Sequence, residues 1–128
     1  KTRQAIEMRF PGLEAANPVD LIADARKRRY SFVLNKVTSD LNVDGVMVIN
    51  MLKSTFFEPE DALAVVKIAA KHDDKPMVDV PAGGEDFALV QKTLRNTSMP
   101  AYNLPEKAAR VLRVLRLYGK IKEKGVEV

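Results

Sequence analysis

Residues 43–66 constrain the fold more than any other part of the chain. They follow the turn-forming run Asp40-Leu41-Asn42, continue from Gly45 into the apolar run Val-Met-Val-Ile at 46–49, and enter a helix at Pro59. A short apolar run that is bounded by glycine and followed by a helical period is typical of a strand buried on both faces. Such strands belong to parallel sheets that helices cover. The sequence therefore predicts an α/β fold with the 50–55 loop at the carboxyl edge of the sheet, where ligands of open α/β folds bind.

The remaining elements are predicted to alternate in the same way. Strands are expected at 19–22, 46–49, 76–81 and 101–104, and helices at 1–10, at 24–38, from 59, after 86 and from 105. Repeated strand-helix alternation implies a three-layer fold, with a parallel sheet, right-handed crossovers and helices on both faces. We expect one domain at 1–119, followed by a charged tail at 120–128 that frays from Gly119 onward.

Composition restricts the class of protein. A chain of 128 residues that is 46% hydrophobic suits one domain with a substantial core. The lack of cysteine excludes disulfides, thiolate catalysis and zinc-thiolate sites. With no apolar run of membrane-spanning length and no signal peptide, a cytoplasmic protein with no membrane partner is expected. Because the chain begins with Lys1 and not with methionine, we expect it to be a piece of a longer polypeptide.

The basic residues are expected to form solvated helix faces. They concentrate at 26–29 and in the last helix and tail, and they give a formal net charge of +4. A basic patch without stacking aromatic side chains or a base-recognition motif gives only non-specific electrostatic attraction. This pattern disfavours a nucleic-acid partner.

Two loops carry residues that can contact phosphate. Lys53, Ser54 and Thr55 follow the central strand, and the Gly83-Gly84 pair precedes a helix, where backbone N–H groups can bind an anion. Carboxylates occupy the helix starts behind both loops, however, at positions 58, 60, 61, 85 and 86. These acids can interact with the helix N-termini themselves, so the domain is predicted to be poorly equipped to bind phosphate alone.

The titratable side chains form no clear catalytic set. His72 is the only histidine, lies at a predicted helix end and has no partner spacing for a triad or a metal site. Asp44 is a turn residue, whereas Asp20 and Asp79 lie in or beside strands and can either bond neighbouring turns or face a ligand. No catalytic residue and no metal ligand is therefore predicted.

Four motifs together resemble one family. They are Asn-Pro-Val-Asp-Leu at 17–21, Asn-Val-Asp-Gly-Val-Met-Val-Ile at 42–49, Gly-Gly-Glu-Asp at 83–86 and Pro-Glu-Lys-Ala-Ala at 105–109. In order and spacing they resemble the ADP-forming acyl-CoA (acetate-CoA) ligases, relatives of succinyl-CoA synthetase. The resemblance covers nearly the whole chain and is to the third, flavodoxin-like domain of the alpha part of such an enzyme.

The resemblance implies a reaction that this chain cannot perform alone. Members of the family interconvert acid, CoA and ATP with acyl-CoA, ADP and phosphate through a phosphorylated histidine in a Ser-His-Thr-Gly motif. This chain lacks that motif, and His72 does not match it. The resemblance implies CoA, ATP or ADP and Mg as cofactors of the full enzyme, with none bound by this chain. The implied partners are the CoA-binding, phosphohistidine and ATP-grasp domains or subunits.

By resemblance, the carboxyl edge is where the phosphohistidine loop docks. The residues expected at this docking edge are Asn17, Asp20, Asn50, Lys53, Ser54, Thr55, Gly83 and Gly84. Family members also carry a strand and a Gly-Gly-Pro-Gly turn upstream of the first helix. That strand is absent here, so we expect a sheet that lacks its first strand.

Two other functions are compatible with the sequence. One is a regulatory ligase-like domain of a protein acetyltransferase, which would keep the fold without ligase chemistry. The other is a receiver-like or nucleotide-binding α/β module with a basic face. The gene upstream and downstream of the chain would separate the first from a ligase, and nucleotide or nucleic-acid binding would support the second.

Overall fold

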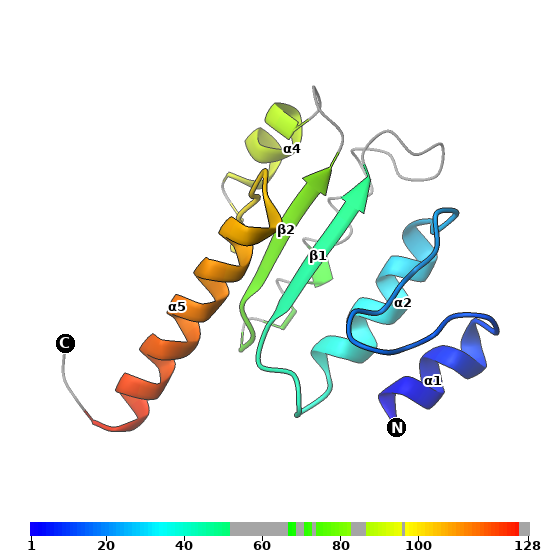
Figure 1. Cartoon of the computed structure of the whole chain (residues 1–128), viewed down its shortest axis with the longest axis horizontal. Coiled ribbons are helices and arrows are strands. Elements are labelled where there is room, and N and C mark those ends of the chain that lie inside the picture. Colours follow the sequence, from blue (N-terminus) through cyan, green and yellow to red (C-terminus); the bar gives the residue numbers. More distant parts are fainter. Residues whose placement is uncertain (52–66, 69–70, 73, 83–86, 96, 126–128) are drawn as a thin grey trace.

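The computed structural model describes residues 1–51, 67–68, 71–72, 74–82, 87–95 and 97–125. Along the chain, the helices and strands are α1 (Thr2–Arg9), α2 (Lys27–Thr38), β1 (Val46–Met51), β2 (Met77–Ala82), α4 (Phe87–Leu94) and α5 (Pro105–Glu123) (Figure 1). The helix predicted from Pro59 and the loop residues Lys53, Ser54, Thr55, Gly83 and Gly84 lie outside the described residues.

The sheet is parallel, as predicted, but smaller. β1 pairs with β2 from Val46 opposite Met77 to Met51 opposite Ala82. The strand expected at 101–104 is reduced to one parallel bridge between Asp79 and Ala101, since its backbone bonds to β2 are the two that Asp79 makes with Pro100 and Tyr102. The described residues therefore form a two-stranded sheet with a single bridge beyond β2, in place of the four strands expected.

The strand predicted at 19–22 is wrong. The backbone N–H of Ile22 donates to Asp20 Oδ1 at 2.8 Å, and Ile22 has a φ of 63°, in the left-handed region. A side-chain carboxylate that bonds the backbone two residues on forms a turn, and a left-handed residue breaks extended geometry. Val19 and Leu21 instead pack against the cluster under α1. Apolar composition here reflects burial beside helices and not strand pairing.

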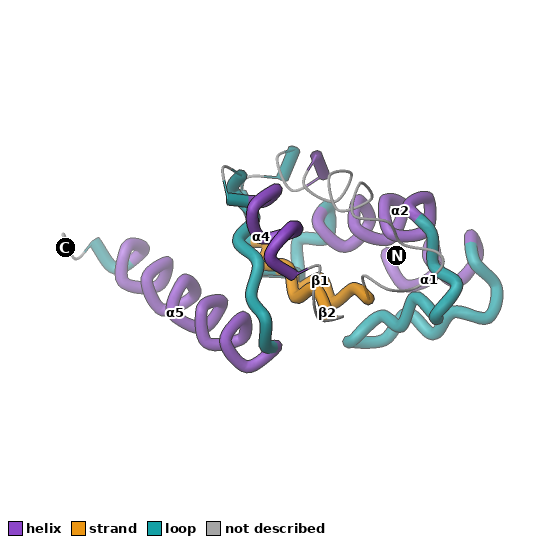
Figure 2. Tube along the Cα trace, turned by 90° about the horizontal axis from the view of Figure 1, so that it is seen from above, coloured by secondary structure: helices purple, strands orange, loops and turns teal. Residues whose placement is uncertain are grey.

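Helices cover both faces of the sheet, which gives the three layers (Figure 2). Side chains alternate along β2, so Met77 faces a cluster with α2 and α4, whereas Val78 and Val80 face Ala108 of α5. Every β2 residue but the last is buried, as expected of a strand covered on both sides. β1 departs from this expectation, because Ile49 is 54% exposed.

A third cluster attaches α1 to α2. Ile6 is fully buried beside Leu13, Ala15 and Val33. The rings of Phe10 and Phe32 meet edge to face with centroids 5.5 Å apart. α1 ends just before Pro11, as predicted from the Pro-Gly pair.

Two helix boundaries differ from the predicted ones. α2 starts at Lys27, three positions after the predicted start at Asp24, because the Asp24 carboxylate is held by Arg29. α5 continues to Glu123, so the residues just after Gly119 are helical and not frayed. Among the described residues, no helix combines the length and the hydropathy that crossing a bilayer requires.

Candidate functional site

The carboxyl ends of β1 and β2 lie at one edge of the sheet, and α2 starts beside it (Figure 1). This is the edge at which the sequence places the docking residues. Of those eight residues, the structure describes Asn17, Asp20 and Asn50. The roles proposed for the other five remain predictions.

Asn17 and Asp20 lie on the exposed segment that leads toward α2. The peptide bond between Asn17 and Pro18 is cis. The side chains of Asn17 and Asp20 are both exposed. Asp20 uses Oδ1 to accept the Ile22 N–H and so holds the turn. The segment thus presents a carboxylate and an amide to solvent.

Asn50 is placed differently, because it is 2% exposed. Its Nδ2 donates to Oδ1 of Asp79 at 2.6 Å, across from β1 to β2. Asp79 is 1% exposed and lies opposite Val48, two strand positions before Pro81, the partner of Asn50. The amide of Asn50 therefore faces the interior, and a role in docking would have to be indirect.

Asp79 is tied to the backbone on its other side. Its N–H donates to the Pro100 carbonyl at 2.9 Å, and its own carbonyl accepts the Tyr102 N–H at 2.8 Å. These two bonds form the parallel bridge beyond β2. Asp79 therefore joins the end of β1, the middle of β2 and the segment before α5.

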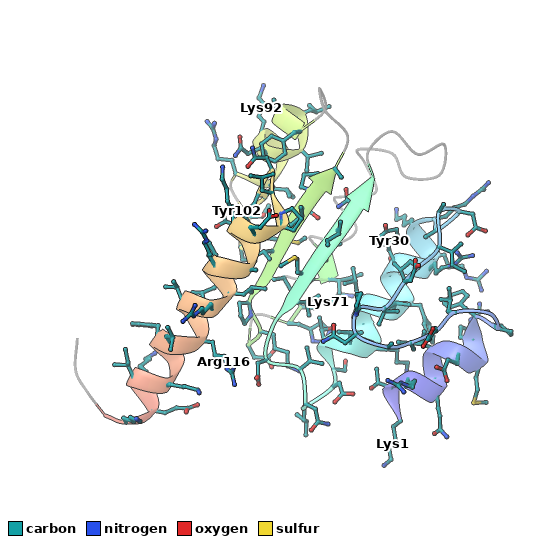
Figure 3. All side chains as sticks on the ribbon, in the orientation of Figure 1. Lys1, Tyr30, Lys71, Lys92, Tyr102 and Arg116 are labelled. Atoms are coloured by element: carbon teal, nitrogen blue, oxygen red, sulfur yellow. The ribbon has the colours of Figure 1, made fainter. Side chains whose placement is uncertain are left out.

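The interior surroundings of Asp79 change its acidity. Burial raises the pKa of the Asp79 carboxyl to about 7, and the hydrogen bond from Asn50 reduces this upward shift. Burial, and secondly the charge of Asp79, raise the pKa of Tyr30 on α2. Tyr30 projects from α2 toward the sheet (Figure 3). Sequence patterns left Asp79 either to bond a neighbouring turn or to face a ligand, and they did not indicate its pairing with Asn50. The signal was an acid in the middle of the apolar run 76–81.

A second polar contact that sequence reasoning missed lies at the start of α2. Nη1 of Arg29 is 2.5 Å from Oδ1 of Asp24 and 2.7 Å from the carbonyl oxygen of Leu21. The Arg29 guanidinium also lies 5.7 Å from the centre of the Phe10 ring. The hydrogen bond from Arg29 lowers the pKa of Asp24. Arg29 is thus a structural residue and an exception to the solvated face predicted for 26–29.

The described residues offer little else that resembles a catalytic centre. They contain no group of three or more His, Asp or Glu side chains placed to hold a metal ion. His72 is half-buried in the turn that precedes β2, and its carbonyl accepts the Lys75 N–H. It lies outside the predicted docking edge.

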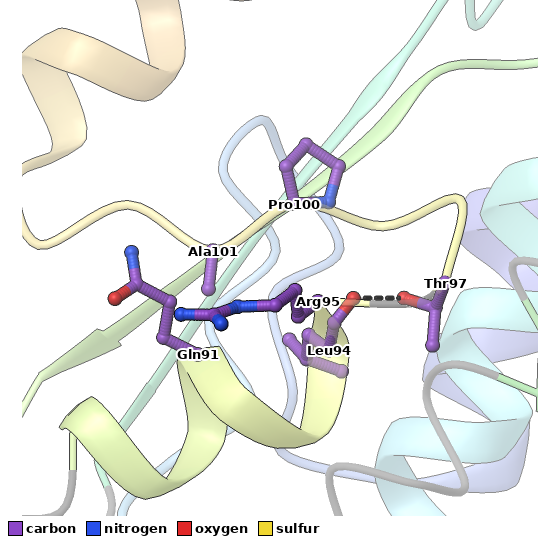
Figure 4. Close-up of a pocket in the computed structure, with 6 residues that line it drawn as sticks. All are labelled: Gln91, Leu94, Arg95, Thr97, Pro100 and Ala101. Carbon is purple, nitrogen blue, oxygen red and sulfur yellow. Dashed lines mark hydrogen bonds between the residues drawn. The ribbon is translucent and has the colours of Figure 1, made fainter.

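One shallow pocket lies at the end of α4 (Figure 4). Thr97 donates its hydroxyl to the Leu94 carbonyl at 2.8 Å and so closes the turn after the helix. The pocket is lined by Gln91, Leu94, Arg95, Thr97, Pro100 and Ala101. None of these residues belongs to the predicted docking edge.

Comparison with known proteins identifies the relationship. No family model matches the chain. A curated relative, the acetate–CoA ligase [ADP-forming] I of Archaeoglobus fulgidus, is 32% identical over 108 residues, which are 84% of this chain. The chain is a domain-sized homologue of part of the ADP-forming acetate–CoA ligases. It spans 15% of the length of that relative, so this ligase-related domain corresponds to a small part of it.

Solved structures agree on the fold. An apo-form acetyl-coenzyme A synthetase 1 of Ca. Korarchaeum cryptofilum matches 99% of the ligase-related domain with a TM-score of 0.81 and 23% identity, over 29% of its own chain. The same synthetase in complex with phosphate and ADP also gives 0.81 and 23%, over 28% of its chain. A Pyrococcus horikoshii OT3 protein matches 82% of the domain, with a TM-score of 0.72 and 24% identity over 25% of its chain.

Proposed function

We propose that the ligase-related domain is a structural and docking domain of an ADP-forming acyl-CoA synthetase. The observation that carries this proposal is the 32% identity to a segment that makes up 15% of an ADP-forming acetate–CoA ligase. The parent enzyme would convert acid, CoA and ATP into acyl-CoA, ADP and phosphate through a phosphohistidine in another domain. CoA, ATP or ADP and Mg would be bound by those other domains.

The exposure of two predicted docking residues supports a docking role without catalysis. Asn17 and Asp20 both present polar side chains to solvent on the segment that precedes α2. Asn50 is bonded inside the core to Asp79. Exposed polar side chains of this kind suit a surface against which a segment of another domain packs. The five predicted docking residues outside the described part of the chain are proposed to belong to the same surface.

The finer fold proposal is a flavodoxin-like sheet that lacks its first strand. Within the described residues β1 pairs only with β2, so its other backbone edge has no described partner strand. An unpaired strand edge is a place where another strand can pair. We infer that upstream residues or another polypeptide supply that strand. An upstream-extended chain should then protect the β1 amides from hydrogen exchange, and unchanged exchange rates would argue against the inference.

Two activity measurements test the functional proposal. The isolated chain should form no acyl-CoA from acid, CoA and ATP, because the residues for phosphoryl transfer are proposed to lie in other domains. In the second, the chain replaces the aligned segment of the Archaeoglobus fulgidus ligase, and the deletion of that segment serves as the control. We expect the chimera to form acyl-CoA and the deletion to form none.

Substitutions in the chimera address the docking edge. Asn17→Ala and Asp20→Ala should lower acyl-CoA formation, whereas Asp44→Ala, an exposed acid in the turn before β1, should leave it unchanged. Turnover by the isolated chain, or a folded chimera without activity, would contradict the proposal. An acetyltransferase domain in the same gene would instead support the regulatory alternative.

A further inference from the structure

The Asn50–Asp79 pair has two hydrogen-bonding atoms that remain without a partner. Asn50 Oδ1 and Asp79 Oδ2 are both buried and accept no hydrogen bond, although the two side chains are joined through Nδ2 and Oδ1 at 2.6 Å. A buried polar atom without a partner costs roughly 1–3 kcal/mol, so orphans of this kind need an explanation. Both orphans are acceptors, and two acceptors can be joined only through a hydrogen.

The chemistry of the two groups indicates where that hydrogen is. A carboxylic acid and a carboxamide have complementary edges, since each offers one donor and one acceptor. The amide already donates to one carboxyl oxygen. One proton on the other carboxyl oxygen would turn that atom into a donor and would satisfy both orphans at once.

Within the part of the chain that the structure describes, no cationic side chain is buried beside Asp79 to stabilise its ionised form. Among the described residues, the buried polar or charged side chains are Thr38, Asn50 and Asp79. The cluster on this face of the sheet consists of apolar side chains, including Leu34 of α2 and Val90 of α4. Tyr30 of α2 is the titratable group that senses the charge of Asp79, and its pKa is raised as well. The charged residues Lys92 and Arg95, on and just after α4, are exposed.

We propose that Asp79 Oδ2 carries a resident proton that it donates to Asn50 Oδ1, so that the pair forms a ring of two hydrogen bonds. Loss of this proton to solvent at higher pH breaks the second bond and leaves a buried charge. The ring ties the end of β1 to the middle of β2. The link between the two strands is therefore sensitive to pH, and it lies near the edge where the sequence places the docking residues. This inference does not rest on the proposed function.

The proposal predicts how stability changes with pH. In the unfolded chain Asp79 loses its proton near 3.8, whereas the folded pair holds it to about 7. The unfolding equilibrium constant should therefore rise between these pH values and level off above them. For this one group the rise from pH 5 to pH 8 is about 100-fold.

The substitution Asp79→Asn provides the decisive variant. An asparagine places an N–H where the proposed acid proton lies, so it should form both hydrogen bonds to Asn50 without titrating. The variant should remain folded and should lose the 100-fold pH dependence. The control Asp44→Asn, at an exposed turn, should keep the wild-type dependence.

Titration of the wild-type chain keeps the test independent of the variant's folding. The side-chain carboxyl carbon of Asp79, followed by NMR, should change its chemical shift near pH 7. A midpoint near 3.8 in the wild type, or a folded Asp79→Asn variant that keeps the 100-fold pH dependence, would overturn the proposal.

Discussion

Nζ of Lys75 lies 2.6 Å from the carbonyl oxygen of Thr38, the last residue of α2. The same ammonium lies 2.5 Å from the carbonyl oxygen of Asp40. The last carbonyls of a helix lack partners within it and carry partial negative charge. Lys75, in the turn before β2, thus donates hydrogen bonds to carbonyl groups at the C-terminal end of α2, which lies far from it in the sequence.

Replacing this lysine by Met should destabilise the chain. Lys75→Met removes two charge-assisted hydrogen bonds, and we expect the free energy of unfolding to fall by about 1–3 kcal/mol. Chemical denaturation measures the loss. Lys71→Met, at an exposed position nearby, is the matched control and should change stability by less than about 0.5 kcal/mol. Equal losses in the two variants would contradict the capping role of Lys75.

Two glycines should respond in opposite ways to alanine. A Cβ on Gly45 would lie 3.2 Å from both Cγ and the carbonyl oxygen of Pro76, at the point where the backbone of Val46 bonds Pro76. Gly45→Ala should cost about 1–3 kcal/mol through this crowding. Gly119 lies within α5 with nothing near its Cβ position, so Gly119→Ala should stabilise the helix by up to about 1 kcal/mol. Thermal unfolding of both variants would reveal the expected difference in sign.

The Arg29 contacts predict that lysine cannot replace this arginine. A lysine has neither the planar fork nor the reach to bond Asp24 and the Leu21 carbonyl together over the Phe10 ring. Arg29→Lys should lower stability by about 1 kcal/mol, mainly through the carbonyl bond.

An NMR titration of the same variant provides a second measurement. The pKa of Asp24, which the hydrogen bond from Arg29 lowers, should rise toward 3.8 in Arg29→Lys. The contribution of this pair is present above pH 3.8 and is lost as the pH falls through the lowered pKa. Arg28→Lys is the control, because Arg28 is exposed, and an Asp24 pKa that is equal in both variants would refute the assignment.

The attachment of α1 depends on Ile6, which is fully buried. Ile6→Ala should cost about 2–5 kcal/mol, because it leaves a cavity between α1 and α2. Met8 on the same helix is 82% exposed, so Met8→Ala should be nearly neutral. Hydrogen exchange of the α1 amides would distinguish local detachment of the helix from global loss of stability. Similar effects of the two substitutions would contradict the packing described for α1.

Sequence patterns predicted the elements whose signals are local. The apolar run at 46–49 gave a parallel strand, the Pro-Gly pair ended α1, and the proline at 105 began α5. The helix predicted at 24–38 is present as α2 from Lys27 to Thr38, with Val33 and Leu34 buried. These features depend on backbone geometry and periodicity, which neighbouring residues determine.

The errors share a different physical origin. Val19 and Leu21 have strand-like composition, but the Asp20 side chain forms a turn and no described strand lies beside them to pair with. Asp24 suits a helix start, but Arg29 holds it outside the helix. In both cases a side-chain contact over a few residues outweighs propensity.

The sequence by itself determined the α/β class, the helix and strand types of most described elements, and the relationship to ADP-forming acetate–CoA ligases. Only the tertiary structure decided what Asn50 and Asp79 do. Their positions are 29 residues apart, and neither carries a local signal of the other. Parallel pairing of β1 with β2 brings them to one buried face, where the loss of water makes a single proton decisive for their bonding.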